Sequence, residues 1–283
     1  MFARAVRAGH CRYLGEFAPR YHALEARYAM SREELFAESA DTPAYTGATV
    51  VLHNRLLGNM SDADLAALVP YLERVELKVG EVLAKGRDLL THVYFPEGCV
   101  ISIVAHMADG TSVEVGTIGD EGMAGLPAYF DGDASEGETL VQIPGSAMRM
   151  RVSHLLQETG ASPSLRRLLN RFALAYMTQL AQNGACNRLH SIEQRCARWL
   201  LMTHDRMGQP KVMPLKQQFL AFMLGVRRAG VSVAAGALQD AGFIRYRRGS
   251  IRVLDRPGLQ RASCECYEII HGTFERMLAR VPE

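Results

Sequence analysis

The segment 215–254 constrains this chain more than any other, because it joins two helical patterns, a turn and a short hairpin. After the turn Leu224-Gly225-Val226, apolar side chains recur at the i, i+3, i+4, i+7 spacing of a buried helical face. Gly242 stands where such a helix ends in the left-handed conformation, and Arg248-Gly249 separates two strand-like runs. This order predicts a helix-turn-helix with a β wing, a device whose second helix fits the major groove of DNA.

The local charge favours the same interpretation. The whole chain has a formal net charge of only +2, but residues 188–261 contain 14 Lys or Arg and 4 Asp or Glu. This segment therefore carries +10 and the remainder of the chain −8. A cluster of that sign attracts phosphates, whereas an isolated run of arginines is more often a solvated surface. Its coincidence with a helix-turn-helix pattern favours DNA as the partner.

Length and composition limit the class of protein. A chain of 283 residues is expected to form about two domains, and 48% hydrophobic with 22% charged residues is typical of a globular protein. No apolar run reaches the ~18–20 residues that cross a membrane, and the first residues lack the apolar core of a signal peptide. We therefore expect a cytoplasmic protein with no membrane partner.

The six cysteines show no spacing of a disulfide framework. Cys264 and Cys266 form the only close pair, and on one helix they would point to different faces, which suits neither a zinc clamp nor a disulfide. We therefore predict no metal ligands and interpret the thiols as buried or incidental. Redox sensing through Cys186 or Cys196, close to the start of the basic segment, is the alternative.

The pattern before the basic segment changes three times. Residues 1–50 form a heterogeneous leader with a linker at 39–47, and 52–72 is predicted to be helical with Ser61 as its N-cap. Short β-rich runs separated by glycine-bearing turns then predict a sandwich or small barrel. These runs are 75–79, 92–95, 100–106, 112–118, 140–143 and 147–152.

A long amphipathic helix is predicted over 164–185, about 30 Å in length. We expect its apolar stripe to pair two copies of the chain, with packing against its own β domain as the alternative. The dimerisation residues predicted in this way are Leu165, Leu169, Phe172, Tyr176 and Leu180.

The order of these parts resembles the Crp/Fnr family of bacterial transcription regulators (cyclic-AMP receptor protein and fumarate–nitrate regulator). The most specific similarities are the segment 191–201, SIEQRCARWLL, and the unit 224–254; Gly80-Glu81 and 118–122 are weaker ones. The resemblance implies an α+β fold, with a cyclic-nucleotide-binding-like β-roll (jelly-roll) domain at 51–160 and a connecting dimerisation helix at 161–187. It further implies a winged helix-turn-helix at 188–270, and we expect 271–283 to be a C-terminal tail.

The resemblance also suggests which residues read DNA. Arg228 stands at the family's guanine-reading arginine, where a bidentate contact is worth about 1–3 kcal/mol. Ala229 replaces the family's usual glutamate and Val233 a further arginine, so we predict no particular operator. The predicted base-reading residues are Arg228, Ala229, Ser232 and Val233. The predicted phosphate contacts are Lys216, Gln218, Arg227, Arg245, Arg247 and Arg248.

A cyclic nucleotide is not expected as a cofactor. Met123 occupies the position of the glutamate that binds ribose in the family, and Thr139 that of the arginine that binds the cyclic phosphate. No arginine occurs between Arg87 and Arg149, whereas acidic residues (Asp131, Asp133, Glu136, Glu138) gather there and would repel an anion. No iron–sulfur or haem site is predicted either.

The sequence thus predicts a homodimeric transcription regulator that binds a pseudo-palindromic double-stranded DNA site. RNA polymerase is a candidate partner, and the effector is unknown. One alternative is a ligand- or partner-binding β-roll protein that has lost DNA binding. The other is a cupin-like metal enzyme using His92, His106 and Glu114, although their spacing lacks the His-x-His of such sites.

Overall fold

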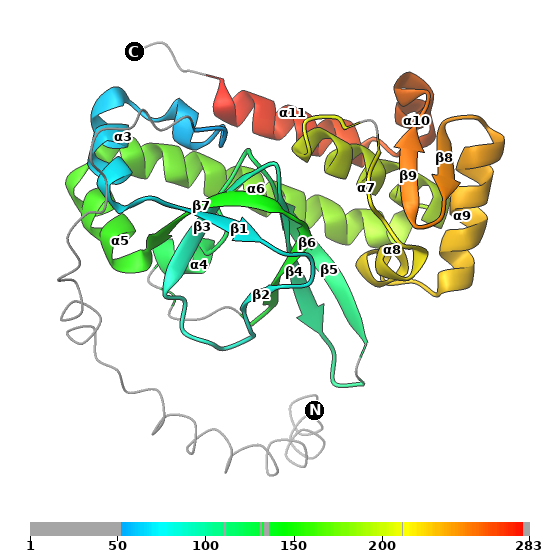
Figure 1. Ribbon diagram of the computed structural model, residues 1–283, viewed down its shortest axis with the longest axis horizontal. Helices are drawn as coiled ribbons and strands as arrows, with labels where there is room; N and C mark the ends of the chain where they lie inside the picture. The colour runs from blue at the N-terminus through cyan, green and yellow to red at the C-terminus, as the bar shows by residue number, and fades with distance from the viewer. Residues whose placement is uncertain (1–51, 110, 131, 133–135, 211, 280–283) are drawn as a thin grey trace, which may run out of the picture. The chain divides into compact units, whose positions relative to one another are not determined.

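The computed structural model describes residues 52–279 except 110, 131, 133–135 and 211 (Figure 1). The predicted leader, its linker at 39–47, Cys11, Asp131 and Asp133 therefore lie outside the described residues. The described elements begin with a 3-10 helix η1 (Leu57–Asn59), helix α3 (Asp62–Leu68) and a second 3-10 helix η2 (Val69–Tyr71).

These three short elements replace the single helix predicted over 52–72. Ser61 caps α3 as expected, its side chain accepting a hydrogen bond from the amide of Asp64. Pro70 has no amide hydrogen to donate, so the α-helical hydrogen bonds stop there and the chain continues as the 3-10 turn η2.

Two antiparallel sheets form the β-roll. The first contains β1 (Glu73–Leu77), β7 (Gly145–Arg151) and β3 (His92–Glu97) in the order β1-β7-β3. The second contains β2 (Val82–Ala84), β6 (Glu138–Ile143), β4 (Val100–His106) and β5 (Ser112–Ile118) in the order β2-β6-β4-β5. All six predicted runs are strands, and only the three-residue β2 escaped prediction because it is too short to show an alternating pattern.

Helices join the β-roll to the C-terminal half. The short α4 (Leu126–Tyr129) lies between β5 and β6, and α5 (Val152–Ala161) follows β7 directly. Helix α6 (Pro163–Leu189) is the long helix predicted over 164–185, extended at both ends. Ser162 caps it, accepting a hydrogen bond from the amide of Leu165, and Pro163 occupies its first turn, where no amide partner is needed.

The predicted dimerisation stripe of α6 requires a correction. Leu165, Leu169, Phe172 and Tyr176 are at most 7% exposed within a single chain, and Leu180 is half-buried. Tyr176 and Leu180 lie against Gly116 of β5, and Phe172 stacks on Tyr176. The stripe therefore packs on the chain's own β-roll, which was the alternative.

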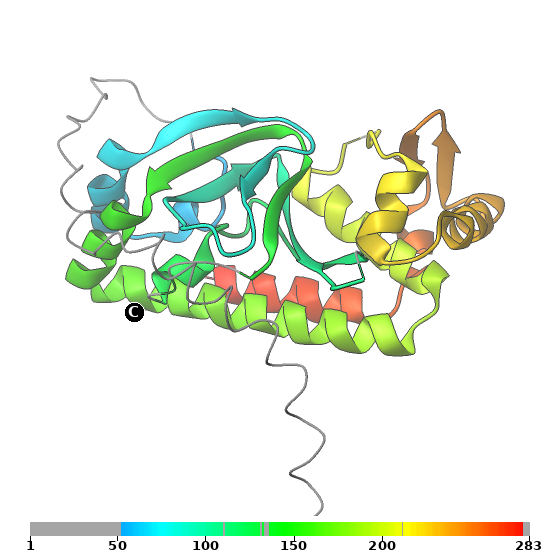
Figure 2. The same ribbon diagram turned by 90° about the horizontal axis from the view of Figure 1, so that it is seen from below.

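The C-terminal half consists of α7 (Ile192–Arg206), α8 (Gln217–Leu224), α9 (Arg228–Asp240), the β8–β9 hairpin (Ile244–Arg247 and Ser250–Val253), α10 (Arg256–Ala262) and α11 (Cys266–Leu278). Helix α11 crosses the boundary at which we expected a tail, and it runs beside α6 (Figure 2). Its buried side chains Ile270, Phe274 and Met277 recur at i, i+4 and i+7, so 266–278 is an amphipathic helix of the core.

Candidate nucleic-acid interface

Helices α8 and α9 meet at 106°, the geometry of a helix-turn-helix. Gly225 ends α8 with φ = 61°, a left-handed conformation that favours glycine, and its Cα faces the Val113 side chain of β5 so closely that a Cβ would clash. Gly242 follows α9 with φ = 78°, as predicted.

No single helix among the described residues is long and apolar enough to span a membrane. The sharply bent pair α8 and α9 meets the criteria of length and composition only when the two helices are taken together.

One face of α9 is open and the other is buried. Val231, Ala234, Ala235 and Leu238 pack inward, as their spacing predicted. The four predicted base-reading residues Arg228, Ala229, Ser232 and Val233 are all exposed, with Val233 at 74%. The structure thus brings them together on one exposed surface at the beginning of α9, which is the part of a recognition helix that reaches base edges.

The wing is a two-residue hairpin. Arg248 and Gly249 both have positive φ (48° and 78°), the combination of a type I′ turn, which matches the twist of the flanking strands. Arg245 lies directly opposite Arg252, and like charges in that position destabilise a hairpin. An anionic partner would relieve this repulsion, so the wing is a surface suited to phosphate.

The other predicted phosphate contacts surround the same face. Arg227 immediately precedes α9, Lys216 precedes α8, and Gln218 lies in the first turn of α8; all three are exposed or half-exposed. The first turns of both helices contain no acidic residue, so the positive ends of their dipoles are not neutralised locally.

A buried polar network joins this domain to the β-roll. Trp199 of α7 donates a hydrogen bond from Nε1 to Oε1 of Glu114 on β5 (3.0 Å), and Gln142 of β6 donates to Thr203 of α7 (3.3 Å).

Glu114 is 8% exposed, and burial raises the pKa of its carboxyl to about 7 despite the hydrogen bonds that it accepts. The Ser102 hydroxyl lies 2.6 Å from Glu114 Oε2 and 2.7 Å from Gln142 Oε1. A hydroxyl has one hydrogen, so Ser102 donates to only one of these two oxygens at a time.

This geometry predicts a pH-dependent stability. The folded pKa of Glu114 lies above the unfolded value of 4.5, so the folded protein binds more protons and its free energy of unfolding falls as the pH rises from 4.5 to about 7. The expected contribution of Glu114 is up to about 3 kcal/mol. Glu114→Gln should remove most of this slope in urea unfolding at pH 5 and pH 7.5, and the exposed Glu136→Gln should leave it unchanged. A residual slope of the same sign is expected from Asp120, since burial raises its pKa to about 6.

Arg206 makes a second connection between the domains. Its guanidinium forms an ion pair with Glu121 at 2.7 Å, both side chains being about 5% exposed, and also donates to Gln179 of α6 at 2.7 Å. Arg206 further contacts Thr117 of β5 and packs against Gly119. Three parts of the chain, the β-roll, α6 and α7, therefore meet at one charged side chain.

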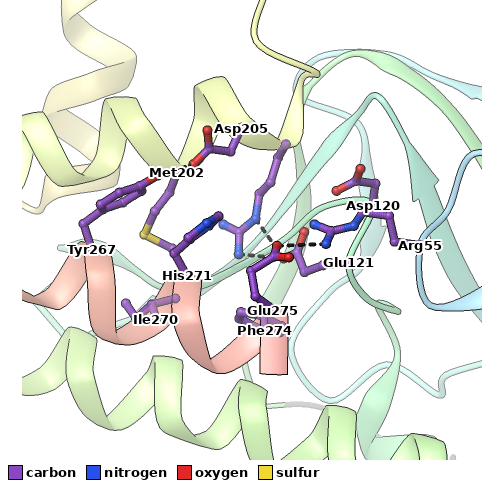
Figure 3. Close-up of a pocket in the computed structure, with 11 residues that line it drawn as sticks. Arg55, Asp120, Glu121, Met202, Asp205, Tyr267, Ile270, His271, Phe274 and Glu275 are labelled. Carbon is purple, nitrogen blue, oxygen red and sulfur yellow. Dashed lines mark hydrogen bonds and ion pairs between the residues drawn. The ribbon is translucent and has the colours of Figure 1, made fainter. Parts of the chain in front are cut away.

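Beside this ion pair lies a cavity of about 60 Å³ (Figure 3). Asp205 at its edge binds the guanidinium of Arg256 (2.6 Å) and accepts a hydrogen bond from Tyr267 (2.7 Å). The cavity has room for a few water molecules and not for a nucleotide, so we assign it no ligand.

The β-roll positions that bind cyclic nucleotide in the family have other roles here. Met123 is fully buried in the apolar core, and Thr139 is buried in β6 opposite Ile103. Phe172 of α6 packs against Gly122, so closely that a Cβ there would clash. Both positions are therefore filled by packing of the β-roll core in this structure.

The residues considered for a cupin-like metal site are not brought together. His92 hydrogen-bonds to Thr91, His106 to Ser112, and Glu114 to Trp199.

Within the described residues, one group of three or more metal-binding side chains converges. It does not include these three residues, and Cys264 belongs to it. Cys264 precedes α11, which begins at Cys266, so our argument that both lie on one helix was wrong.

Comparison with known proteins identifies the C-terminal half. Residues 194–262 match the family model of the Crp-like helix-turn-helix domain. No curated protein matches the sequence.

Solved structures share the fold of the longer region at low identity. FixK2 from Bradyrhizobium japonicum is 16% identical, with a TM-score of 0.60 over 68% of this chain and 98% of that one. TTHB099, a CRP-family transcriptional regulator from Thermus thermophilus, is 18% identical, with a TM-score of 0.55 over 68% and 96%. CLP, a c-di-GMP responsive global regulator from Xanthomonas campestris, is 16% identical, with a TM-score of 0.51 over 68% and 99%. The predicted resemblance and fold class are confirmed.

Proposed function

We propose that this chain, with a Crp-like helix-turn-helix domain on a Crp/Fnr-type fold, is a sequence-specific DNA-binding transcription regulator that acts as a dimer. The observation that carries the proposal is the exposed surface of α9 and the wing. Arg228, Ser232 and Val233 are presented together for base contact, and the surrounding cations are open to phosphate. Arg228 would supply sequence specificity by contacting bases, and the wing would supply affinity by contacting phosphates.

The exposed face of α6 supplies a surface for dimerisation. Leu174, Met177, Ala181 and Gly184 follow one another at intervals of three, four and three residues, and Leu174 is 67% and Met177 60% exposed. This is the spacing of a coiled-coil seam, and the small residues permit close approach of two helices. Pairing of this seam would place two α9 helices on one DNA site, about one helical turn apart.

Leu174→Glu should therefore convert the dimer to a monomer. The symmetry of a parallel seam brings each glutamate close to its counterpart, so like charges meet at the interface. Light scattering coupled to size exclusion at micromolar concentration measures the mass. Val79→Glu, which introduces the same charge at a 61% exposed position in the β-roll, is the control and should remain dimeric. A wild-type monomer would contradict the dimeric model.

The contacts between the domains suggest how a signal would act. The strand β5 contacts α6, α7 and α8, and Ser102 of β4 lies 3.8 Å from the Met223 sulfur of α8. A change in the β-roll that displaces β5 would alter the orientation of the helix-turn-helix and so the population competent for DNA. An effector and RNA polymerase are the further partners in this scheme.

Selection of bound duplexes from a randomised DNA pool, followed by sequencing, tests the proposal. An inverted repeat with half-sites about ten base pairs apart is the expected result. Failure to enrich any sequence at low salt would instead favour a β-roll protein that has lost DNA binding. TTHB099 and CLP are described as regulators, and we propose no catalytic residue for this chain.

A further inference from the structure

Four metal-binding side chains from two distant parts of the sequence converge at the end of α6. Cys186 and His190 come from the last turn of α6 and its C-cap, Cys264 from the loop after α10, and Cys266 from the start of α11. One ligand atom from each lies within 4.8 Å of all the others. The three thiols are at most 4% exposed, and the His190 side chain is 16% exposed.

The spacing of these atoms fits a single tetrahedral ion. With zinc–sulfur bonds of about 2.3 Å and zinc–nitrogen bonds of about 2.05 Å, tetrahedral coordination separates two thiolates by about 3.8 Å and a thiolate from an imidazole by about 3.5 Å. The sulfurs of Cys186 and Cys264 are 3.5 Å apart, and the Cys266 sulfur is 3.5 Å from His190 Nδ1. A two-iron cluster would divide its ligands between two ions and needs a wider set.

The groups behind these side chains are those that support metal ligands. With Nδ1 turned to the thiols, the other imidazole nitrogen of His190 lies 3.3 Å from the Glu265 carboxylate, the arrangement that orients metal-binding histidines. The amide of Gln182 donates to the Cys266 sulfur at 3.2 Å. Such a hydrogen bond stabilises sulfur as a thiolate, which is the form that binds metal.

Charge balance gives an independent indication. Arg195 and Arg198 of α7 are 8% and 5% exposed, and within the described part of the chain neither guanidinium has a carboxylate at ion-pair distance. Burial lowers the pKa of Arg195, because the interior disfavours its charged form. A buried cation needs a compensating anion, and three thiolates with one divalent ion carry a net charge of −1.

We propose that Cys186, His190, Cys264 and Cys266 bind one zinc ion, which ties the loop between α10 and α11 to the end of α6. All four coordination positions are filled by side chains, so the site is closed and structural and leaves no position for a substrate. The ion would fix the C-terminal helix against α6 where α6 leads into the DNA-binding domain. A Cys186–Cys264 disulfide is the competing outcome, and it requires the sulfurs to approach by about 1.5 Å.

Metal content and a cobalt titration of the full-length protein test the site. Protein produced in zinc-containing medium and kept reduced should hold about one zinc per chain. After removal of zinc by a chelator, Co²⁺ should bind at about one per chain, with the visible bands of tetrahedral cobalt and the near-ultraviolet charge-transfer band of thiolate ligands. Cys264→Ser should lose zinc and the spectrum, whereas Cys196→Ser, which alters an equally buried thiol of α7, should retain both.

Three outcomes would overturn the proposal. They are a wild-type protein without zinc whose reduced form gives no cobalt–thiolate bands, an isolated Cys186–Cys264 disulfide in place of metal, and equal loss of metal in Cys196→Ser. If Cys264→Ser fails to fold, the cobalt spectrum of the wild-type protein decides, since it reports the ligands directly. DNA binding is not part of the readout, so the result is independent of the proposed function.

Discussion

Arg228→Ala should weaken binding to the selected DNA site by about 5- to 150-fold per half-site, and should relax the preference at one base pair of each half-site. The reason is the loss of a bidentate arginine–guanine contact, worth about 1–3 kcal/mol. Arg228 is the first residue of α9 and is exposed, so its removal leaves the buried face of that helix unchanged. Fluorescence anisotropy with the selected duplex and with single-base variants of it measures both effects.

Two further variants make this result specific. Arg247→Ala in the wing should weaken binding to all sequences alike and reduce the salt slope by about one unit, because it removes a phosphate contact. Arg87→Ala removes the same charge from the β-roll surface, where Arg87 pairs with Glu136, and should change neither affinity nor preference. Unchanged affinity of Arg228→Ala for the selected site, together with an unchanged preference at every base pair, would refute base reading by Arg228.

Arg206→Met should lower the free energy of unfolding by about 3–5 kcal/mol, the largest effect on stability that we expect from a single change. The substitution keeps the apolar stem and removes the charge, so Glu121 stays buried without its partner. Within the described part of the chain, the hydrogen-bond donor left to Glu121 is the amide of Gly119, at 3.2 Å in its own turn. Urea unfolding at pH 7.5 followed by Trp199 fluorescence measures the loss, since Trp199 lies in the same helix as Arg206.

The matched control is Arg55→Met. Arg55 forms an ion pair of similar length with Glu275 (2.8 Å), but both side chains are at least 40% exposed. An exposed ion pair contributes about 0–1 kcal/mol to the free energy of unfolding. Comparing the two variants therefore separates the effect of burying the pair from the effect of removing a charge. A loss below about 1 kcal/mol in Arg206→Met would mean that water reaches Glu121 and that the domains do not pack closely there.

Local patterns predicted the elements because their causes are local. The strands, the turn at Gly225 and the hairpin at Arg248-Gly249 follow from residue alternation and from glycine at positions of positive φ. In α6 the periodicity indicates that one face is buried, but it does not distinguish burial against a second copy of the chain from burial against the chain's own β-roll. The helix has two apolar stripes, and the stronger, through Phe172, packs within the chain, leaving the weaker, through Leu174, exposed.

Contacts between distant residues could not be predicted in this way. Glu121 and Arg206 are 85 positions apart, and Cys186 and Cys264 are 78 apart, so no spacing rule connects them. The close pair Cys264 and Cys266 is the one signal of the cluster in the sequence, and it suits a metal site only because the two residues do not share a helix. The residues proposed to read DNA were accessible to prediction because α9 presents them at consecutive turns of a single element.

The bonds from α7 to β5 also limit how freely this winged helix can be transferred to another protein. Among the described residues, the hydrogen-bond partners of the Trp199 indole and the Arg206 guanidinium are Glu114, Thr117 and Glu121 of the β-roll and Gln179 of α6. Packed against a sensor that lacks these groups, the C-terminal half would bury a guanidinium and an indole N–H without acceptors. A chimera that grafts it onto a different sensor must therefore bring a matching carboxylate pair, or replace both α7 side chains by apolar ones.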